Sequence, residues 1–327
     1  MNKKRGKTFL KGLLLGTLAL SMMFTGGCGK KEEKTKIAVI TMGHEAEFWQ
    51  MLKKGAEDAS NEVDIEMIFD SPDVETDFAR QVQIINEAVN NNVDAIVISP
   101  CSYDDPDITQ ALDKAKNNGI KIVTVNSDSA SDGVLANLST DNEAAGGIAA
   151  REAMKYYPGD NKKIAVLGFN EGNEVCAARV DNFLDNIQGD MGDNIIPTRY
   201  TENSVDTAKE VTKTLINEYP DLAVVYASNE GCTVGACQAV EELGMKDSVT
   251  VIGFDSSETE VKYVNDGILK GFVAQSPYNM GYLGVRYALK AINGESLPYY
   301  IDTGATLVTP ENVNDQITQL IIHPEKF

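Results

Sequence analysis

Short apolar runs alternate with amphipathic stretches along the chain from residue 36 onward. The runs are rich in Val and Ile and are continuously apolar, which is typical of parallel strands that are covered on both faces. They predict strands at Lys36–Thr41, Ile65–Asp70, Ala95–Ser99, Lys121–Asn126, Val134–Asn137, Lys163–Gly168, Ile195–Tyr200, Ala223–Ala227, Val249–Gly253 and Ile268–Ala274. Strands and helices in this alternation predict an α/β protein with doubly wound parallel sheets.

Capping residues mark the ends of two helices between these strands. Asp107 is placed to cap a helix that ends at Asn117-Asn118-Gly119. Ser204 is placed to cap a helix that runs to Tyr219, just before Pro220. Both predictions use the preference of Asp and Ser for the position before the first helical turn.

Two segments of the chain share one arrangement. In the first, the apolar run and polar cluster of Asp94–Ser102 precede a helical stretch and then Lys121–Asp128; in the second, Asp221–Asn229 and Val249–Ser257 repeat the pattern. Polar side chains thus follow the carboxyl ends of strands, where ligands bind in open parallel sheets. We therefore expect two lobes that face each other across a polar cleft, with a tight hinge at Leu138–Asn142.

The N-terminal segment has the layout of a secretory signal. Five basic residues precede the apolar run Gly12–Phe24, which is too short for a stable membrane anchor. Thr25-Gly26-Gly27-Cys28 resembles a bacterial lipobox, although Thr25 stands where that motif usually has a branched aliphatic residue. We expect a lipoprotein signal peptide at 1–27 and a tether at 28–35, so that Cys28 anchors an extracytoplasmic protein to the cell membrane. The alternative is a membrane-anchoring helix with an incidental cysteine.

Charge excludes one class of partner. Residues 1–27 hold five of the 29 Lys and Arg and none of the 49 Asp and Glu, so the remainder has a formal net charge of −25. Such a chain repels phosphate backbones, and we expect no nucleic-acid partner. About 290 residues also exceed what one hydrophobic core usually holds, which favours two lobes.

Cysteine and histidine do not form a recognisable metal site. Cys101, Cys176, Cys232 and Cys237 include no CxxC pair, and only His44 and His323 are available to complete a cluster. We predict no metal and no cofactor, and interpret the four cysteines as buried free thiols. A thiol pair formed by Cys101 and Cys176 across the cleft is the alternative.

Six segments, in order, carry a family resemblance: Thr140–Asn142, Ala177–Phe183, Ala227–Glu230, Val251–Ser257, Asp266–Pro277 and Leu307–Val313. Together they resemble the ribose/galactose-type (type 1) periplasmic sugar-binding proteins of bacterial ABC importers. The resemblance implies two lobes joined by three hinge crossovers, near Asn137–Asp141, Gln275–Pro277 and Thr303–Thr306. The N-terminal lobe would then comprise 36–139 and 276–304, and the C-terminal lobe 140–275 and 305–327.

The resemblance also implies a set of ligand-binding residues. Asp255 matches the family's aspartate that grips adjacent sugar hydroxyls, and Arg179 its ligand-binding arginine; the alternatives are a helix N-cap and a surface salt bridge. Asn229 and Gln275 match positions that bond hydroxyls, with an Asx-turn and a hinge backbone bond as alternatives. Asp141 matches a contact at the first crossover, or else caps the next helix.

The aromatic residues and the departures from the family complete the predicted site. Phe48 and Trp49 stand where similar proteins present aromatic rings to the sugar, although core packing would explain one of them. Where ribose-binding proteins have Asp-Arg, this chain has Asn126-Ser127 followed by Asp128. Ser99 replaces an Asn, and Asn203 replaces an aromatic residue. We therefore expect a hexose or another polyol rather than ribose; a furanosyl signalling molecule is a weaker match.

These observations predict a monomeric binding protein that delivers a monosaccharide to an ABC permease. A sugar sensor that presents its ligand to a receptor kinase or chemoreceptor is the alternative, because its binding site would look the same. No GxSxG, Walker loop or HExxH is present, so we do not expect an enzyme. A thiol enzyme using Cys101 with His44 is the one catalytic arrangement the sequence offers.

Overall fold

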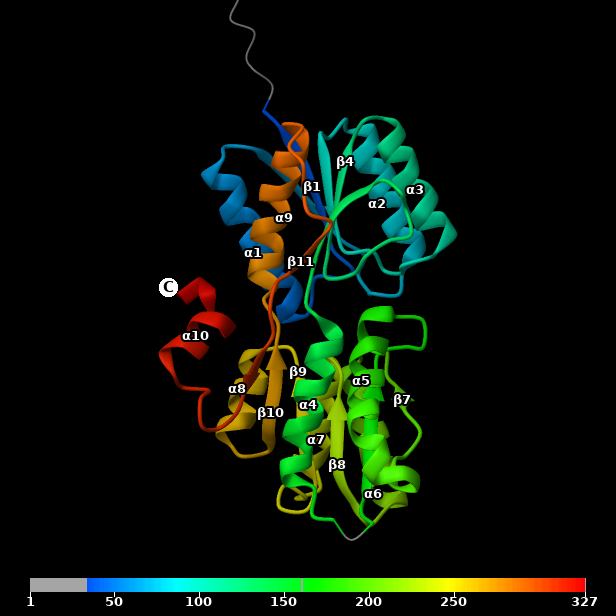
Figure 1. The fold of residues 1–327 in the computed structure, drawn as a ribbon, viewed down its shortest axis with the longest axis vertical. Coiled ribbons are helices and arrows are strands. Elements are labelled where there is room, and N and C mark those ends of the chain that lie inside the picture. Colours follow the sequence, from blue (N-terminus) through cyan, green and yellow to red (C-terminus); the bar gives the residue numbers. More distant parts are fainter. Residues whose placement is uncertain (1–33, 160, 327) are drawn as a thin grey trace, which may run out of the picture. The chain divides into compact units, whose positions relative to one another are not determined.

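The computed structural model describes residues 34–159 and 161–326. The predicted signal peptide, Cys28 and most of the predicted tether lie outside the described residues. Within the described ranges the strands form two six-stranded sheets (Figure 1). No helix in these ranges is long and apolar enough to cross a bilayer.

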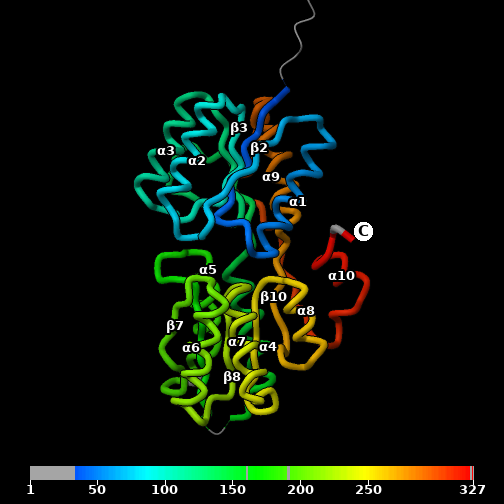
Figure 2. Tube along the Cα trace, turned by 180° about the vertical axis from the view of Figure 1, so that it is seen from behind, coloured from blue at the N-terminus to red at the C-terminus, as the bar shows by residue number. Residues whose placement is uncertain are grey.

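The first sheet is parallel throughout, with the strand order β11-β5-β4-β3-β1-β2. Its strands are β1 Lys36–Ile40, β2 Glu66–Asp70, β3 Ala95–Ile98, β4 Lys121–Val125, β5 Val134–Ser139 and β11 Tyr300–Asp302. Four helices cover it: α1 Glu47–Glu62, α2 Phe78–Asn90, α3 Pro106–Asn117 and α9 Pro277–Ile292. Figure 2 shows α2 and α3 on one side of this sheet and α1 and α9 on the other.

The second sheet has the order β12-β10-β9-β8-β6-β7, and only its β10–β12 pair is antiparallel in the described residues. Its strands are β6 Lys163–Gly168, β7 Arg199–Tyr200, β8 Leu222–Ala227, β9 Thr250–Phe254, β10 Leu269–Ala274 and β12 Thr306–Val308. The helices α4 Asn142–Tyr156 and α5 Glu174–Met191 pack together, as do α6 Val205–Glu218 and α7 Glu230–Glu242. The helices α8 Glu258–Asn265 and α10 Gln316–Ile322 complete the chain, with short 3-10 turns at Gly192–Asn194 and Pro324–Lys326.

The predicted fold class is confirmed: two α/β lobes, each built on a parallel-dominated sheet with helices on both faces. The central strands are fully buried runs of aliphatic residues, as the continuous apolar pattern predicts for strands covered on both sides. The chain passes between the sheets three times, through residues 140–141, 275–276 and 303–305. These are the predicted crossover positions.

Several element boundaries differ from those predicted from the sequence. The strand expected at Ile195–Tyr200 is confined to Arg199–Tyr200 because Pro197 lacks the amide hydrogen that a strand ladder needs. Asp105, not Asp107, caps α3, because Pro106 occupies the first helical position. The edge strands β11 and β12 were missed because each is three residues long. Ser204 caps α6 as predicted, accepting from the Thr207 amide.

Two close helix contacts hold the elements that carry the site. Gly281 of α9 lies directly against the Leu52 carbonyl of α1, so that an added Cβ would collide with it. Gly146 of α4 lies against the Arg179 carbonyl of α5 in the same way. The absence of a side chain at these two glycines therefore fixes how closely α1 and α5, the helices that begin at the cleft, approach the rest of their lobes.

Candidate functional site

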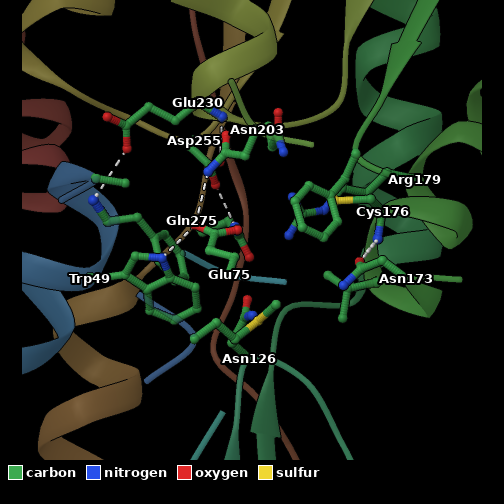
Figure 3. A pocket seen from close by; sticks show the side chains of 16 residues that line it. Trp49, Glu75, Asn126, Asn173, Cys176, Arg179, Asn203, Glu230, Asp255 and Gln275 are labelled. Carbon is green, nitrogen blue, oxygen red and sulfur yellow. Dashed lines mark hydrogen bonds between the residues drawn. The ribbon is translucent and has the colours of Figure 1, made fainter. Parts of the chain in front are cut away.

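A cavity of about 40 Å³, open to solvent, lies between the two sheets at the carboxyl ends of their strands. Residues of both lobes line it, and Figure 3 shows their side chains converging on it. The lining is Met42, Ala46, Phe48, Trp49, Glu75, Asn126, Phe169, Asn173, Val175, Cys176, Arg179, Asn203, Asn229, Glu230, Asp255 and Gln275. This location is the one at which doubly wound sheets bind ligands.

Asp255 occupies the centre of a hydrogen-bond network. One carboxylate oxygen accepts from the Glu230 amide at 2.8 Å and the other from the Gln275 side-chain amide at 2.5 Å. Gln275 in turn accepts from the Thr140 hydroxyl at 2.8 Å, so it links the first two crossovers to the site. Ser257, not Asp255, caps α8. The helix-cap alternative for Asp255 is therefore wrong.

Arg179 is a buried cation on the first turns of α5, with 2% of its surface exposed. Its Nε donates to the Asn142 side chain at 2.8 Å, and one terminal nitrogen donates to the Ser228 carbonyl at 3.0 Å. The guanidinium carbon lies 3.9 Å from the centroid of the Phe254 ring. Neutral acceptors and a ring face hold the group in place, so the surface salt-bridge alternative is wrong.

The two predicted aromatics both line the cavity. Phe48 and Trp49 open α1, are 7% and 4% exposed, and meet edge to face with ring centroids 4.7 Å apart. The Trp49 indole donates to Glu75 at 2.7 Å. Phe169, which follows β6 on the other lobe, adds a third ring to the wall. Aromatic rings therefore line the cavity from both lobes.

Amide side chains complete the polar wall. Asn229 caps α7, accepting from the Cys232 amide at 3.1 Å, while it also lines the cavity. Asn203 accepts from the Gly231 amide at 2.8 Å and donates to Glu75 at 2.9 Å. Asn126, Asn203 and Asp255 all have left-handed backbone conformations, with φ of 65°, 57° and 78°. Such strain, on the order of 1 kcal/mol per residue, persists where surrounding contacts over-determine the conformation and is concentrated at functional sites.

Three predicted ligand residues do not line the cavity. Ser99 is fully buried behind Asn126, which donates to its hydroxyl at 3.3 Å. Asp128 accepts from Thr124 at 3.1 Å and from the Tyr299 hydroxyl at 2.8 Å. Asp141 is exposed and caps α4, accepting from the Ala144 amide at 2.9 Å, as the capping alternative describes. Their hydrogen bonds account for these side chains without a ligand.

Two glutamates of the wall were missed by sequence reasoning. Glu75 lies in the loop after β2, and Glu230 is the residue next to the predicted Asn229. Burial raises the pKa of Glu230 to about 7, and the nearby Asp255 carboxylate adds to this rise. Burial also raises the pKa of Glu75, against the effect of its hydrogen bonds from Trp49 and Asn203. One signal in the sequence could have identified such residues: they follow the end of a parallel strand. Applied to β2 and β6, this rule points to Glu75, Phe169 and Asn173.

The cysteines are buried and free, as predicted, in the described part of the chain. Burial raises the pKa of Cys176 to about 11 and that of Cys101 far above its usual value. The thiolate needed for nucleophilic chemistry is thus suppressed, and His44 meets the Ser71 hydroxyl at 2.9 Å rather than a cysteine. No group of metal-ligating side chains occurs among the described residues.

The fold and the cavity define a two-lobed α/β binding protein whose site lies between the lobes. A family model described as "Periplasmic binding protein domain" matches residues 37–296, and the chain belongs to this family. It is a family of substrate-binding proteins of transport systems, not of enzymes.

Relatives agree with this assignment. The chain is 25% identical over 266 residues to the ribose import binding protein RbsB of Haemophilus influenzae, covering 81% of this chain and 88% of that one. A solute-binding protein of an ABC transporter from Agrobacterium vitis with bound D-fucose superposes with a TM-score of 0.84 at 31% identity, covering 88% of this chain and 100% of its own. One from Agrobacterium radiobacter in complex with D-arabinose has a TM-score of 0.84 at 28% identity, covering 89% and 100%.

Proposed function

We propose that this protein captures a neutral monosaccharide, a pentose, hexose or related polyol, between its lobes and delivers it to an ABC permease. The observation that carries the proposal is the composition of the cavity wall. Asp255, Arg179 and five amide side chains surround the space, and aromatic rings line it from both lobes. The sugars named for the similar proteins support the same ligand class.

The wall matches the chemistry of a sugar. Each sugar hydroxyl both donates and accepts a hydrogen bond, which suits carboxylates, amides and a guanidinium, and each C–H face suits an aromatic ring. Glu75, Glu230 and Asp255 oppose a single cation, Arg179, in the lining. A phosphorylated or carboxylated sugar would place another negative charge among these carboxylates, so we expect the ligand to be uncharged.

Ligand capture requires contacts from both lobes, because a ligand shifts the equilibrium only toward the state that it binds better. We assign ligand contacts to Phe48, Trp49 and Asn126 on the first lobe. On the second lobe and the crossovers we assign them to Arg179, Asn203, Asn229, Asp255 and Gln275. We propose that the lobes are residues 36–139 with 276–304, and 140–275 with 305–327. The crossing points of the chain support these bounds.

We further propose that the mature protein is a monomer held outside the cell membrane by a lipid on Cys28. The basic segment, the short apolar run and the lipobox-like Thr25-Gly26-Gly27-Cys28 support the anchor. Palmitate labelling of cells that express the chain tests it. Label should enter the wild type and be absent from Cys28→Ala; equal labelling of both would contradict the anchor.

A thermal-shift screen against D-ribose, D-allose, D-fucose, D-arabinose, D-tagatose and their alditols tests the ligand class. A sugar that binds only the folded protein at 100 times its Kd adds about 2.7 kcal/mol to the free energy of unfolding and raises Tm accordingly. D-ribose 5-phosphate is the charge control and should give no shift. Absence of any shift from the neutral sugars, or a shift from the phosphate ester alone, would contradict the proposal.

A further inference from the structure

Helix α1 lacks a capping side chain of its own. Helices α2 to α8 are each capped by the side chain of the residue before their first turn. The corresponding residue of α1 is Ala46, which has no polar side chain. The free amide hydrogens at the start of α1 therefore need an acceptor from elsewhere. Since α1 begins at the cleft and carries Phe48 and Trp49, that acceptor acts on the ligand site.

Glu230 of the opposite lobe supplies the acceptor. Its two carboxylate oxygens accept from the amides of Glu47 and Phe48, each at 3.3 Å. These amide donors and the positive end of the helix dipole favour the ionised form of Glu230, but burial and the neighbouring Asp255 outweigh them and raise its pKa. Glu230 lines the cavity, so this contact between the lobes lies at the cavity wall (Figure 3).

Glu75 makes the reciprocal contact from the first lobe. It accepts from the Asn203 side chain across the cleft at 2.9 Å and from the Trp49 indole of its own lobe at 2.7 Å. The two glutamates therefore bridge the cleft in opposite directions, and both are partly buried in this arrangement of the lobes. Separation of the lobes would leave α1 uncapped and return both carboxylates to solvent.

We propose that Glu230 is a positioning residue that holds the cleft closed by capping α1 across the lobes. Glu75 makes the equivalent contact from the first lobe, by accepting a hydrogen bond from Asn203. This inference deepens the proposed function, on which it rests. Each of these two contacts partly buries a carboxylate, so closure of the cleft depends on the ionisation of Glu230 and Glu75.

The charges around Glu230 set the sign of the pH dependence. It faces Glu47 from α1, Asp255 from the loop after β9 and Glu260 from α8, all acidic; Glu75 and the cation Arg179 line the same cavity. With the lobes in contact the pKa of Glu230 is raised to about 7, chiefly by burial; opening would expose the group and lower its pKa, although Asp255 of the same lobe stays beside it. The closed state thus binds a proton more tightly than the open state. Closure takes up a proton and is favoured as pH falls from above 7 towards 5.5.

Spin labels placed on the exposed faces of α2 and α6 test the inference through the distance between the lobes. In sugar-free wild type, the closed-to-open ratio should rise on the order of tenfold from pH 8.5 to pH 5.5. In Glu230→Gln, whose neutral amide takes up no proton, the rise should be smaller than in the wild type, and the remainder should come from Glu75. Glu295→Gln, an exposed substitution away from the cleft, is the matched control and should behave as wild type.

The affinity for each sugar that shifts Tm should follow the same pH dependence in calorimetry, with proton uptake in wild type and less uptake in Glu230→Gln. A ratio in wild type that does not change with pH, or an equal change in wild type and Glu230→Gln, would overturn the inference. If no sugar binds, the proposed function fails, and the sugar-free distances still decide whether Glu230 controls closure.

Discussion

The two walls of the cleft are stabilised in different ways. On the second lobe, Asp255 and Arg179 are fixed by hydrogen bonds within that lobe and its crossovers. On the first lobe, Phe48 and Trp49 stand at a helix end whose cap comes from the opposite lobe. The wall on the second lobe is therefore preorganised, whereas the wall on the first lobe is completed when the lobes meet. We therefore expect a sugar to bind first to the second lobe and the aromatic wall to close over it.

The largest effect should come from Asp255, because the preorganised wall depends on it. Asp255→Asn removes one acceptor and leaves either the Glu230 amide or the Gln275 side chain without its partner. We expect the sugar Kd to rise at least 100-fold, about 3 kcal/mol, in calorimetry.

Asp141→Asn is the matched control for this substitution. Asn caps helices as well as Asp does, and Asp141 does not line the cavity, so Kd should stay at the wild-type value. Equal losses in both variants would mean that the cavity is not the binding site. An unchanged Tm of the sugar-free Asp255→Asn protein shows that the loss arises in binding rather than folding.

Arg179→Lys should have an intermediate effect on the same wall. The lysine keeps the charge but loses the planar group that lies on Phe254 and donates to Asn142 and Ser228 at once. We expect Kd to rise roughly 10- to 30-fold, about 2 kcal/mol, in calorimetry at pH 7. Binding equal to that of the wild type would show that the guanidinium supports the lobe without contacting the sugar.

Trp49→Phe should have the smallest effect, since it alters the wall that closes last. The substitution keeps an aromatic ring and removes the hydrogen bond to Glu75. We expect a roughly fivefold rise in Kd, about 1 kcal/mol, and this rise should lie in the dissociation rate measured by surface plasmon resonance. A slower association rate with unchanged dissociation would reverse the order of events, because Trp49 would then act at first contact.

The fold could be predicted from the sequence because local signals specify it. Continuous Val- and Ile-rich runs gave the central strands, which are buried on both faces, and Ser204 marked the start of α6. The three-residue edge strands β11 and β12 carry too few apolar positions for any periodicity to show. Pro106 occupies the first helical position of α3, so Asp105 is its cap. Because Asp104, Asp105 and Asp107 lie so close together, the sequence alone did not show which of them caps the helix.

Position after a strand end predicted part of the cavity lining, and the family resemblance predicted the helical residues Phe48, Trp49 and Arg179. Asp255, Asn229 and Asn126 follow strands in this way and line the cavity. Asp128 and Asp141 also follow strands. Their carboxylates, however, accept hydrogen bonds from the Tyr299 hydroxyl and the Ala144 amide and do not line the cavity. Glu230, in contrast, could not be predicted from local sequence. Its role depends on a helix end more than 180 residues away in the chain, a contact that only the folded arrangement of both lobes reveals.

Emission of Trp49 during titration with the neutral sugars tests the central claim most directly. Trp49 is the single tryptophan of the chain and lines the cavity, so no label is needed. A neutral monosaccharide that enters between the lobes should change this emission in a saturable, one-to-one titration, and Asp255→Asn should shift the titration to sugar concentrations at least 100-fold higher. Emission that stays constant with every sugar at millimolar concentration would contradict the claim that this cleft binds a monosaccharide.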